Sequence, residues 1–187
     1  MIADFDCSYV IVGHSERRTY SHESNQTAVT RIKRAVDAAI TPIYCVGETL
    51  EEHAAGQTKQ MIEAQVLAIF DLDETTLSQA KAVNLVIAYE PVWAIGTGYA
   101  ADPDHVQAIH AFIRRLIKQY DADFAKKVRI IYGGSLTPDN ACSILTLPDI
   151  DGGLVGHSAL NVLAFTQICR VASNTGACQT LTPVEIN

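Results

Sequence analysis

Short runs of β-branched and aromatic residues recur along this chain, and a helical pattern follows most of them. Within a run the apolar residues are continuous rather than alternating, as expected for strands that are covered on both faces. Each run ends at a glycine or a polar residue; the runs are 9–12, 43–46, 85–89, 128–132 and 154–155. This alternation of strands and helices predicts an α/β fold with a parallel sheet.

Two of the expected helices carry clear start signals. Asp102-Pro103 and Thr137-Pro138 each combine an N-cap residue with a proline at the first helical position. Further helices are expected at 27–39 and 60–70. The strand–helix period is similar to that of a (β/α)8 TIM barrel, which has eight strands in about 250 residues. This chain of 187 residues contains five such runs.

The charge and composition of the chain exclude several classes of function. The net charge is -7 and no basic stripe occurs, so no nucleic-acid partner is expected. No apolar run reaches membrane-spanning length and no signal-peptide pattern opens the chain, so we expect no membrane association and a cytoplasmic location. The cysteines form no Cys-x-x-Cys pair, and neither a metal cluster nor a nucleotide fingerprint is present; no metal and no cofactor are therefore expected.

Polar residues follow the first and third runs, at the strand ends where barrels of this kind carry function. His14 follows Gly13 at a helix start, where the helix dipole disfavours imidazolium and a neutral ring can donate a hydrogen bond. The alternative is a helix cap by Ser15 with a surface histidine. Glu90 ends an apolar strand, which predicts a general base with a raised pKa. The alternative is a salt-bridged strand end with a packed loop.

Glycine-rich segments suggest a lid and a phosphate site. Residues 91–97 place bulky apolar side chains between a proline and paired glycines, the composition of a hinged lid. The segments 132–135 and 151–158 lie at the last two runs, where backbone N–H groups and a helix N-terminus can bind an anion. Phosphate is the usual ligand at that position of a barrel.

These segments together resemble the triosephosphate isomerase family. The matching motifs, in that family's order and spacing, are GHSERR, CVGE, AYEPVWAIGTG, YGGS and DIDGGLVG. The resemblance runs from Met1 to about Val171 and implies cofactor-free interconversion of dihydroxyacetone phosphate and D-glyceraldehyde 3-phosphate, in glycolysis and gluconeogenesis. It also implies a homodimer for the full-length family member.

The resemblance assigns roles to individual residues. It implies that Glu90 is the catalytic base, that His14 polarises the substrate carbonyl, and that Glu16 is a third catalytic-site residue. The residues at the family's phosphate-contacting positions are Gly96, Ser135, Gly156 and His157. His157 stands where the family carries a glycine. Cys45 and Glu48 are expected to serve structure rather than chemistry.

The resemblance also implies how the chain is organised. Residues 1–172 correspond to strands 4 to 8 of the barrel, and 173–187 form a tail without helical periodicity that we expect to be disordered. The family's catalytic lysine lies ahead of the matched region, so we expect the chain alone to be neither an efficient isomerase nor a stable monomer. Two alternatives are a catalytically impaired fragment or non-catalytic phosphate-binding protein of the same fold, and a different phosphate-binding barrel enzyme.

Overall fold

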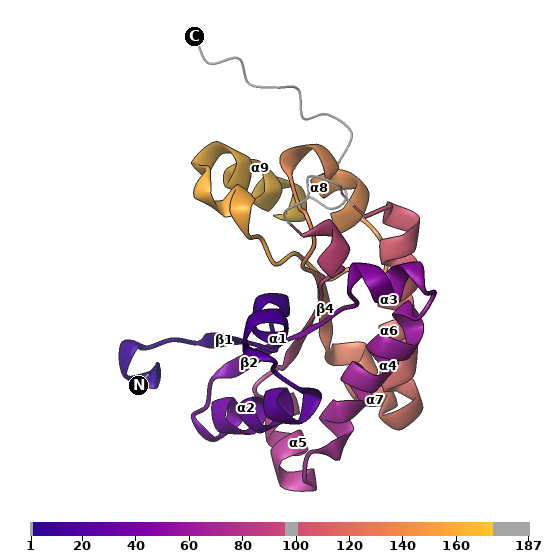
Figure 1. Cartoon of the computed structure of the whole chain (residues 1–187). Coiled ribbons are helices and arrows are strands. Elements are labelled where there is room, and N and C mark those ends of the chain that lie inside the picture. The colour runs from indigo at the N-terminus through magenta and orange to yellow at the C-terminus, as the bar shows by residue number, and fades with distance from the viewer. Residues whose placement is uncertain (1, 96–100, 174–187) are drawn as a thin grey trace.

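The computed structural model describes residues 2–95 and 101–173, and its centre is a parallel sheet. The described strands are β1 (Tyr9–Val12), β2 (Thr41–Val46), β3 (Val86–Tyr89) and β4 (Arg129–Tyr132). They pair in the order β1-β2-β3-β4, so each strand lies beside its neighbours along the chain. Their carboxyl ends therefore meet at one edge of the sheet (Figure 1).

Helices connect the strands, as the sequence predicts. The α-helices are α1 (Ser15–Ser21), α2 (Asn25–Asp37), α3 (Leu50–Ala54), α4 (Thr58–Leu67), α5 (Glu74–Ala82), α6 (Pro103–Tyr120), α7 (Ala122–Lys127), α8 (Pro138–Leu145) and α9 (Val162–Ser173). The 3-10 helices are η1 (Ala3–Phe5), η2 (Ala68–Asp71), η3 (Val92–Ala94) and η4 (His157–Leu160).

The predicted helix starts at Asp102 and Thr137 are confirmed. The Asp102 carboxylate accepts a hydrogen bond from the His105 backbone N–H, which caps α6. Thr137 forms a capping box with Asn140 at the start of α8. These caps fix where each helix leaves its strand, and so they fix the loops at the carboxyl edge of the sheet.

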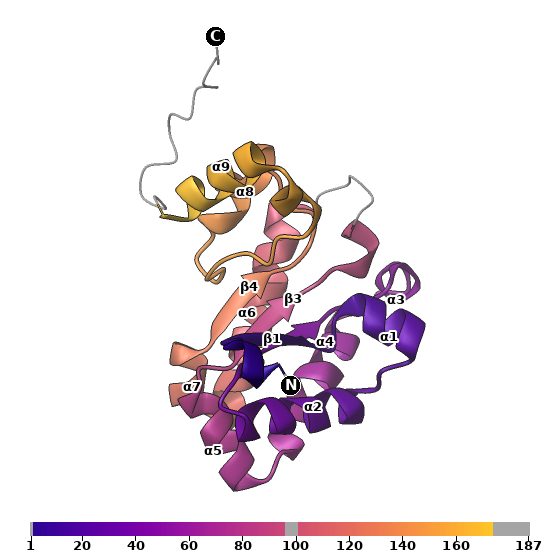
Figure 2. The ribbon, with the colours of Figure 1, turned by 90° about the vertical axis from the view of Figure 1, so that its left-hand side faces the viewer.

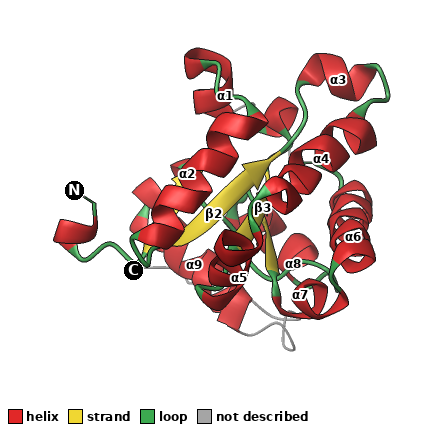
Figure 3. Ribbon diagram, turned by 90° about the horizontal axis from the view of Figure 1, so that it is seen from below, coloured by secondary structure: helices red, strands yellow, loops and turns green. Residues whose placement is uncertain are grey.

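The core lies between the sheet and the helices that cover its outer face. Every residue of β3 is buried, and the apolar faces of α2, α4 and α6 pack against the strands. Seen from below, α2, α4, α5 and α6 surround the strands on that side (Figure 3). In the views of Figures 1 and 2, α8 and α9 lie together, away from α2 and α5. β1 is an outermost strand of the described sheet, and its residues Tyr9 and Ile11 are exposed by 53% and 44%.

The expected fifth strand at 154–155 is wrong as a full strand. Here the structure has a single bridge between Tyr132 and Gly153, followed by a hydrogen bond from the Leu154 N–H to the Tyr132 carbonyl. A β-carbon at Gly153 would lie 2.5 Å from Leu136 Cδ2, so glycine permits this close approach. The apolar run is only two residues long, and η4 begins soon after it.

Two other expectations about the chain have different outcomes. In the described residues no helix is both long and apolar enough to cross a membrane. The expected tail at 173–187 begins with the last residue of α9, and residues 174–187 lie outside the described residues.

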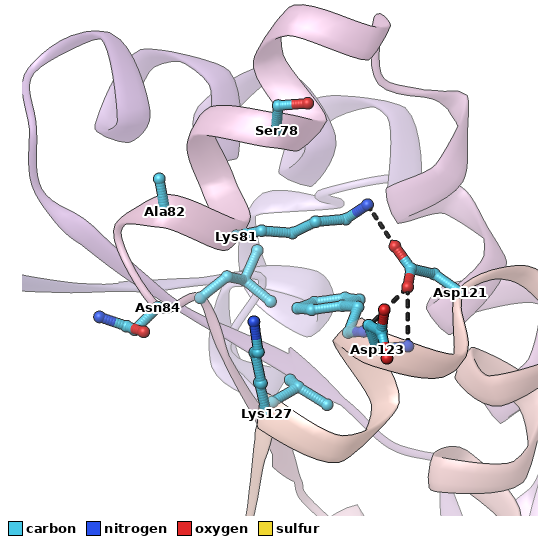
Figure 4. A pocket seen from close by; sticks show the side chains of 10 residues that line it. Ser78, Lys81, Ala82, Asn84, Asp121, Asp123 and Lys127 are labelled. Atoms are coloured by element: carbon cyan, nitrogen blue, oxygen red, sulfur yellow. Dashed lines mark hydrogen bonds and ion pairs between the residues drawn. The ribbon is translucent and has the colours of Figure 1, made fainter.

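A pocket of about 320 Å³ lies at the amino-terminal ends of β3 and β4, opposite their carboxyl ends. Its wall includes Leu85 and Val128, which directly precede β3 and β4. Figure 4 shows Lys81 reaching from α5 to Asp121, with 2.6 Å between Lys81 Nζ and Asp121 Oδ2. Asp121 also accepts backbone hydrogen bonds at the start of α7. The Lys81–Asp121 ion pair joins α5 to the start of α7 and so has a structural role.

Truncation of Ile87 should reveal how much stability the sheet core supplies. Ile87 is fully buried in β3, and removing such a side chain leaves a cavity. We expect Ile87→Ala to lower the free energy of unfolding by about 2–5 kcal/mol, measured by urea denaturation. Leu50→Ala, at an exposed position of α3, is the control and should change it by less than about 0.5 kcal/mol. Equal effects of both changes would contradict this packing.

Candidate active site

Glu90 directly follows β3 and is buried at the carboxyl edge of the sheet, where its two oxygens have different partners. Oε2 accepts a hydrogen bond from the Ser15 backbone N–H at 3.0 Å. Oε1 lies 3.2 Å from His14 Nε2. Only 2% of Glu90 is exposed, so its carboxylate is held by α1 and its N-cap rather than by water.

Two glycines on neighbouring strands make room for Glu90. A β-carbon at Gly47 would lie 1.8 Å from the Glu90 carbonyl oxygen, and one at Gly133 would lie 2.9 Å from Glu90 Cγ. Gly133 donates its N–H to the Tyr89 carbonyl, and Glu90 donates its own to the Val46 carbonyl. The backbones after β2, β3 and β4 therefore approach one another more closely than larger residues would allow.

The environment of Glu90 favours its protonated form. Burial raises the pKa of this carboxyl group above its usual value, and the nearby His14, Ser15 N–H, Cys45 and Arg18 only partly oppose that effect. Burial also raises the pKa of the Cys45 thiol well above its usual value, so Cys45 is a neutral neighbour. A carboxylate with a raised pKa accepts a proton readily, as a general base requires.

The hydrogen bonds of His14 determine which ring nitrogen carries the proton. His14 is the N-cap of α1, and its Nδ1 accepts the Glu16 backbone N–H at 3.3 Å. Nδ1 therefore carries no proton, and in this arrangement Nε2–H is the donor directed at Glu90. The helix is capped by His14 and not by Ser15, so the alternative of a Ser15 cap is wrong. A ring with its proton on Nε2 has a donor that can also serve a carbonyl oxygen placed beside Glu90.

Arg18 holds the loop that carries His14, and sequence reasoning had not singled it out. Its guanidinium donates to the carbonyls of Gly13 and Cys45 and to the side chain of Asn25. These bonds join the end of β1 to the end of β2 and to the start of α2. The signal in the sequence was the position of Arg18 one turn after His14 on the same helix.

The structure brings the two glycine-rich loops together. Ser158 Oγ donates to the Leu136 carbonyl at 2.7 Å, which ties η4 to the loop after β4. Ser135 lies in that loop, two residues after the Gly133 that contacts Glu90. Gly156 is exposed and precedes η4, whose first residue is His157. Gly96 lies outside the described residues.

The backbone at His157 accommodates a side chain where the family carries a glycine. His157 is not among the described residues with positive φ, so its β-carbon causes no backbone strain. Its side chain is exposed.

Glu16 is exposed in the first turn of α1, and its backbone N–H rather than its carboxylate contacts His14.

The start of the segment predicted as a lid is hydrogen-bonded to the buried residue Glu48. In η3 the Trp93 Nε1–H donates to Glu48 Oε1 at 2.8 Å, and the Val92 N–H donates to the Glu48 carbonyl. Glu48 is fully buried, in agreement with a structural role. Of the predicted lid, 91–95 are described and the remainder lies outside the described residues.

The chain matches one protein family over most of its length. The family model described as triosephosphate isomerase matches residues 1–172. This chain belongs to the triosephosphate isomerase family. The triosephosphate isomerase of Herminiimonas arsenicoxydans is 46% identical over 172 residues, which are 92% of this chain and 68% of that relative. The enzyme of Nitrosomonas europaea is 47% identical over 175 residues, which are 93% of this chain and 68% of that relative.

A relative from a third genus agrees. The triosephosphate isomerase of Francisella tularensis subsp. novicida is 42% identical over 173 residues, or 92% of this chain and 67% of that relative. Family membership thus covers the whole region that holds Glu90, His14 and the glycine-rich loops.

Substitution of Gly47 should test the close approach around Glu90. Because an added β-carbon would meet the Glu90 carbonyl oxygen at 1.8 Å, Gly47→Ala must displace that backbone. We expect a loss of about 1–3 kcal/mol in the free energy of unfolding. Leu50→Ala, at an exposed position of α3, is again the control for stability. A Gly47→Ala protein as stable as the parent would refute this geometry.

Proposed function

We propose that the chain acts as a triosephosphate isomerase, which interconverts dihydroxyacetone phosphate and D-glyceraldehyde 3-phosphate in glycolysis and gluconeogenesis. The observation that carries the proposal is the contact between the buried Glu90 carboxylate and Nε2 of His14. Isomerisation between a ketone and an aldehyde needs a base for a carbon-bound proton and a donor for the carbonyl oxygen. This pair supplies both groups within one contact distance.

The proton moves in two steps. Glu90 removes a proton from the substrate carbon beside the carbonyl, and the electron pair of that C–H bond forms the enediolate. The Nε2–H of His14 donates to the oxygen on which negative charge develops. Between the two steps the proton of the substrate hydroxyl moves from one oxygen to the other, relayed by His14 Nε2, which gives its own proton to one oxygen and takes one from the other. The protonated Glu90 then returns the proton to the neighbouring carbon, and the carbonyl now lies on the carbon that lost its proton. Substrate and product have the same composition, so the reaction consumes no oxidant and needs no cofactor.

The residues proposed to bind the substrate phosphate are Gly96, Ser135, Gly156 and His157. The bond from Ser158 to Leu136 supports this assignment, because it holds the loops of Ser135 and Gly156 together. Backbone N–H groups and a serine hydroxyl suit a phosphate. Residues 91–97 would close over the bound substrate and shield the enediolate from water. Glu16 would position His14 through its backbone N–H.

We also propose how the chain fits the family's architecture. Residues 1–172 would supply strands 4 to 8 of a (β/α)8 barrel, with the Tyr132–Gly153 bridge in the place of the last strand. The four parallel strands and their helical connections support this correspondence. As in the family at large, the functional protein would be a cytoplasmic homodimer acting on a small triose phosphate.

Replacement of Glu90 tests the proposed base. Glu90→Gln keeps the size of the side chain but cannot accept the substrate proton, so we expect kcat to fall by about 10²–10⁴-fold. Binding of a phosphate-bearing enediolate analogue should be measured beside turnover, to show that the site still forms. Glu63→Gln, on the exposed side of α4, is the matched control. A kcat within a few-fold of the parent would remove Glu90 from this role.

Replacement of His157 tests the proposed phosphate site. The imidazole of His157 adds bulk beside Gly156, where phosphate is proposed to approach the backbone. We therefore expect His157→Gly to lower KM for dihydroxyacetone phosphate while leaving kcat nearly unchanged. The ionic-strength dependence of KM should be compared for His157→Gln, which keeps the bulk and removes the basic nitrogen. A raised KM in His157→Gly would show that the side chain assists binding.

A further inference from the structure

Three potential metal ligands meet beside the start of the predicted lid. They are Glu48 after β2, His53 in α3 and His105 in the first turn of α6. One ligand atom from each lies within 4.8 Å of the other two. No metal cluster is expected from the sequence, because these residues are spread over 58 positions and form no spacing motif. Only the fold brings them together.

Glu48 is a buried carboxylate without a cationic side chain of fixed charge. It is fully buried, and within the described part of the chain its ion-pair partner is His53, with 3.5 Å between Glu48 Oε1 and His53 Nδ1. Oε1 accepts hydrogen bonds from Trp93, Tyr89 and Thr58. Oε2 is buried and has no hydrogen-bond partner among the described residues. A buried carboxylate oxygen without a partner is costly unless a cation binds it.

The two imidazoles are arranged around that carboxylate. His53 stacks on Trp93 with 4.5 Å between ring centroids, and it meets the ring of His105 edge-on at 5.3 Å. His105 Nε2 lies 3.3 Å from the Tyr89 hydroxyl, which itself contacts Glu48.

We propose that Glu48, His53 and His105 form a binding site for a divalent transition-metal cation such as Zn²⁺. Two imidazoles and one carboxylate, with water in the fourth position, are a suitable ligand set for zinc. Metal–ligand bonds of about 2.0–2.2 Å place tetrahedral ligands roughly 3.3–3.6 Å apart. The three atoms lie within 4.8 Å of one another, so they need to approach by at most about 1.2–1.5 Å, which rotation of the half-buried histidine side chains provides.

The bound cation would also act on the start of the lid. Trp93 is bonded to Glu48 and stacked on His53, so two of the three ligands hold its indole. A cation that binds Glu48 Oε1 would compete with the Trp93 Nε1–H for its acceptor, whereas a cation that binds only Oε2 would leave that hydrogen bond in place. This consequence for lid closure rests on the proposed function, whereas the metal site itself does not.

The single tryptophan of the chain makes the site directly observable. Trp93 is the only tryptophan in the sequence. Co²⁺ bound at this cluster should therefore quench most of the tryptophan fluorescence of the protein. The untagged full chain would be titrated with Co²⁺, and visible absorption of the bound ion and equilibrium dialysis with Zn²⁺ would be recorded in parallel. We expect saturable quenching with one ion per chain, and displacement of Co²⁺ by Zn²⁺.

Substitution of single ligands separates this site from adventitious binding. His53→Gln and His105→Gln should each weaken Zn²⁺ binding by about tenfold or more in dialysis. His22→Asn removes an exposed imidazole at a position with φ of 50°, which asparagine tolerates, and should leave the affinity unchanged. Circular dichroism checks that every variant is folded. Absence of saturable binding, or equal affinity in both ligand variants and the parent, would overturn the proposal whatever the outcome of turnover assays.

Discussion

The site depends on keeping the Glu90 carboxylate out of water while giving each of its oxygens one partner. Burial alone would raise the pKa of this group but would not fix its orientation. The Ser15 N–H fixes one oxygen at the start of α1, and His14 Nε2 lies 3.2 Å from the other. The same helix start thus supplies the donor that orients the proposed base and the imidazole that is proposed to face the substrate. A change in the entry angle of α1 would disturb both.

The surrounding scaffold is arranged to hold that contact. Gly47 and Gly133 allow the neighbouring strand ends to approach Glu90, and Arg18 ties the His14 loop to the end of β2. Parallel pairing in sequence order places all of these groups at one edge of the sheet. The pocket around Lys81 and Asp121 lies at the amino-terminal ends of the strands, where this ion pair joins α5 to α7. Chemistry and stability are therefore separated along the strand direction, as in barrels generally.

Much of this arrangement could be predicted from the sequence, because local signals were strong. Apolar runs marked β1 to β4, and N-cap residues with proline marked α6 and α8. The run at 154–155 was predicted as a strand, yet two apolar residues next to Gly153 supply only one bridge. The capping role of His14 depends on a side-chain orientation that no sequence pattern specifies. The meeting of Glu48, His53 and His105 depends on how three elements pack, so it was invisible in a linear motif.

The central claim is that burial tunes Glu90 to accept a proton, and direct titration of this carboxyl group tests it most closely. Carbon-13 NMR of protein labelled at glutamate side chains, assigned by the signal lost in Glu90→Gln, would follow its ionisation with pH. Because burial disfavours the charged form, Glu90 should remain protonated to a higher pH than an ordinary glutamate and titrate above the reference pKa of 4.5. A Glu90 pKa at or below 4.5 would mean that hydrogen bonds outweigh burial, and would contradict the account.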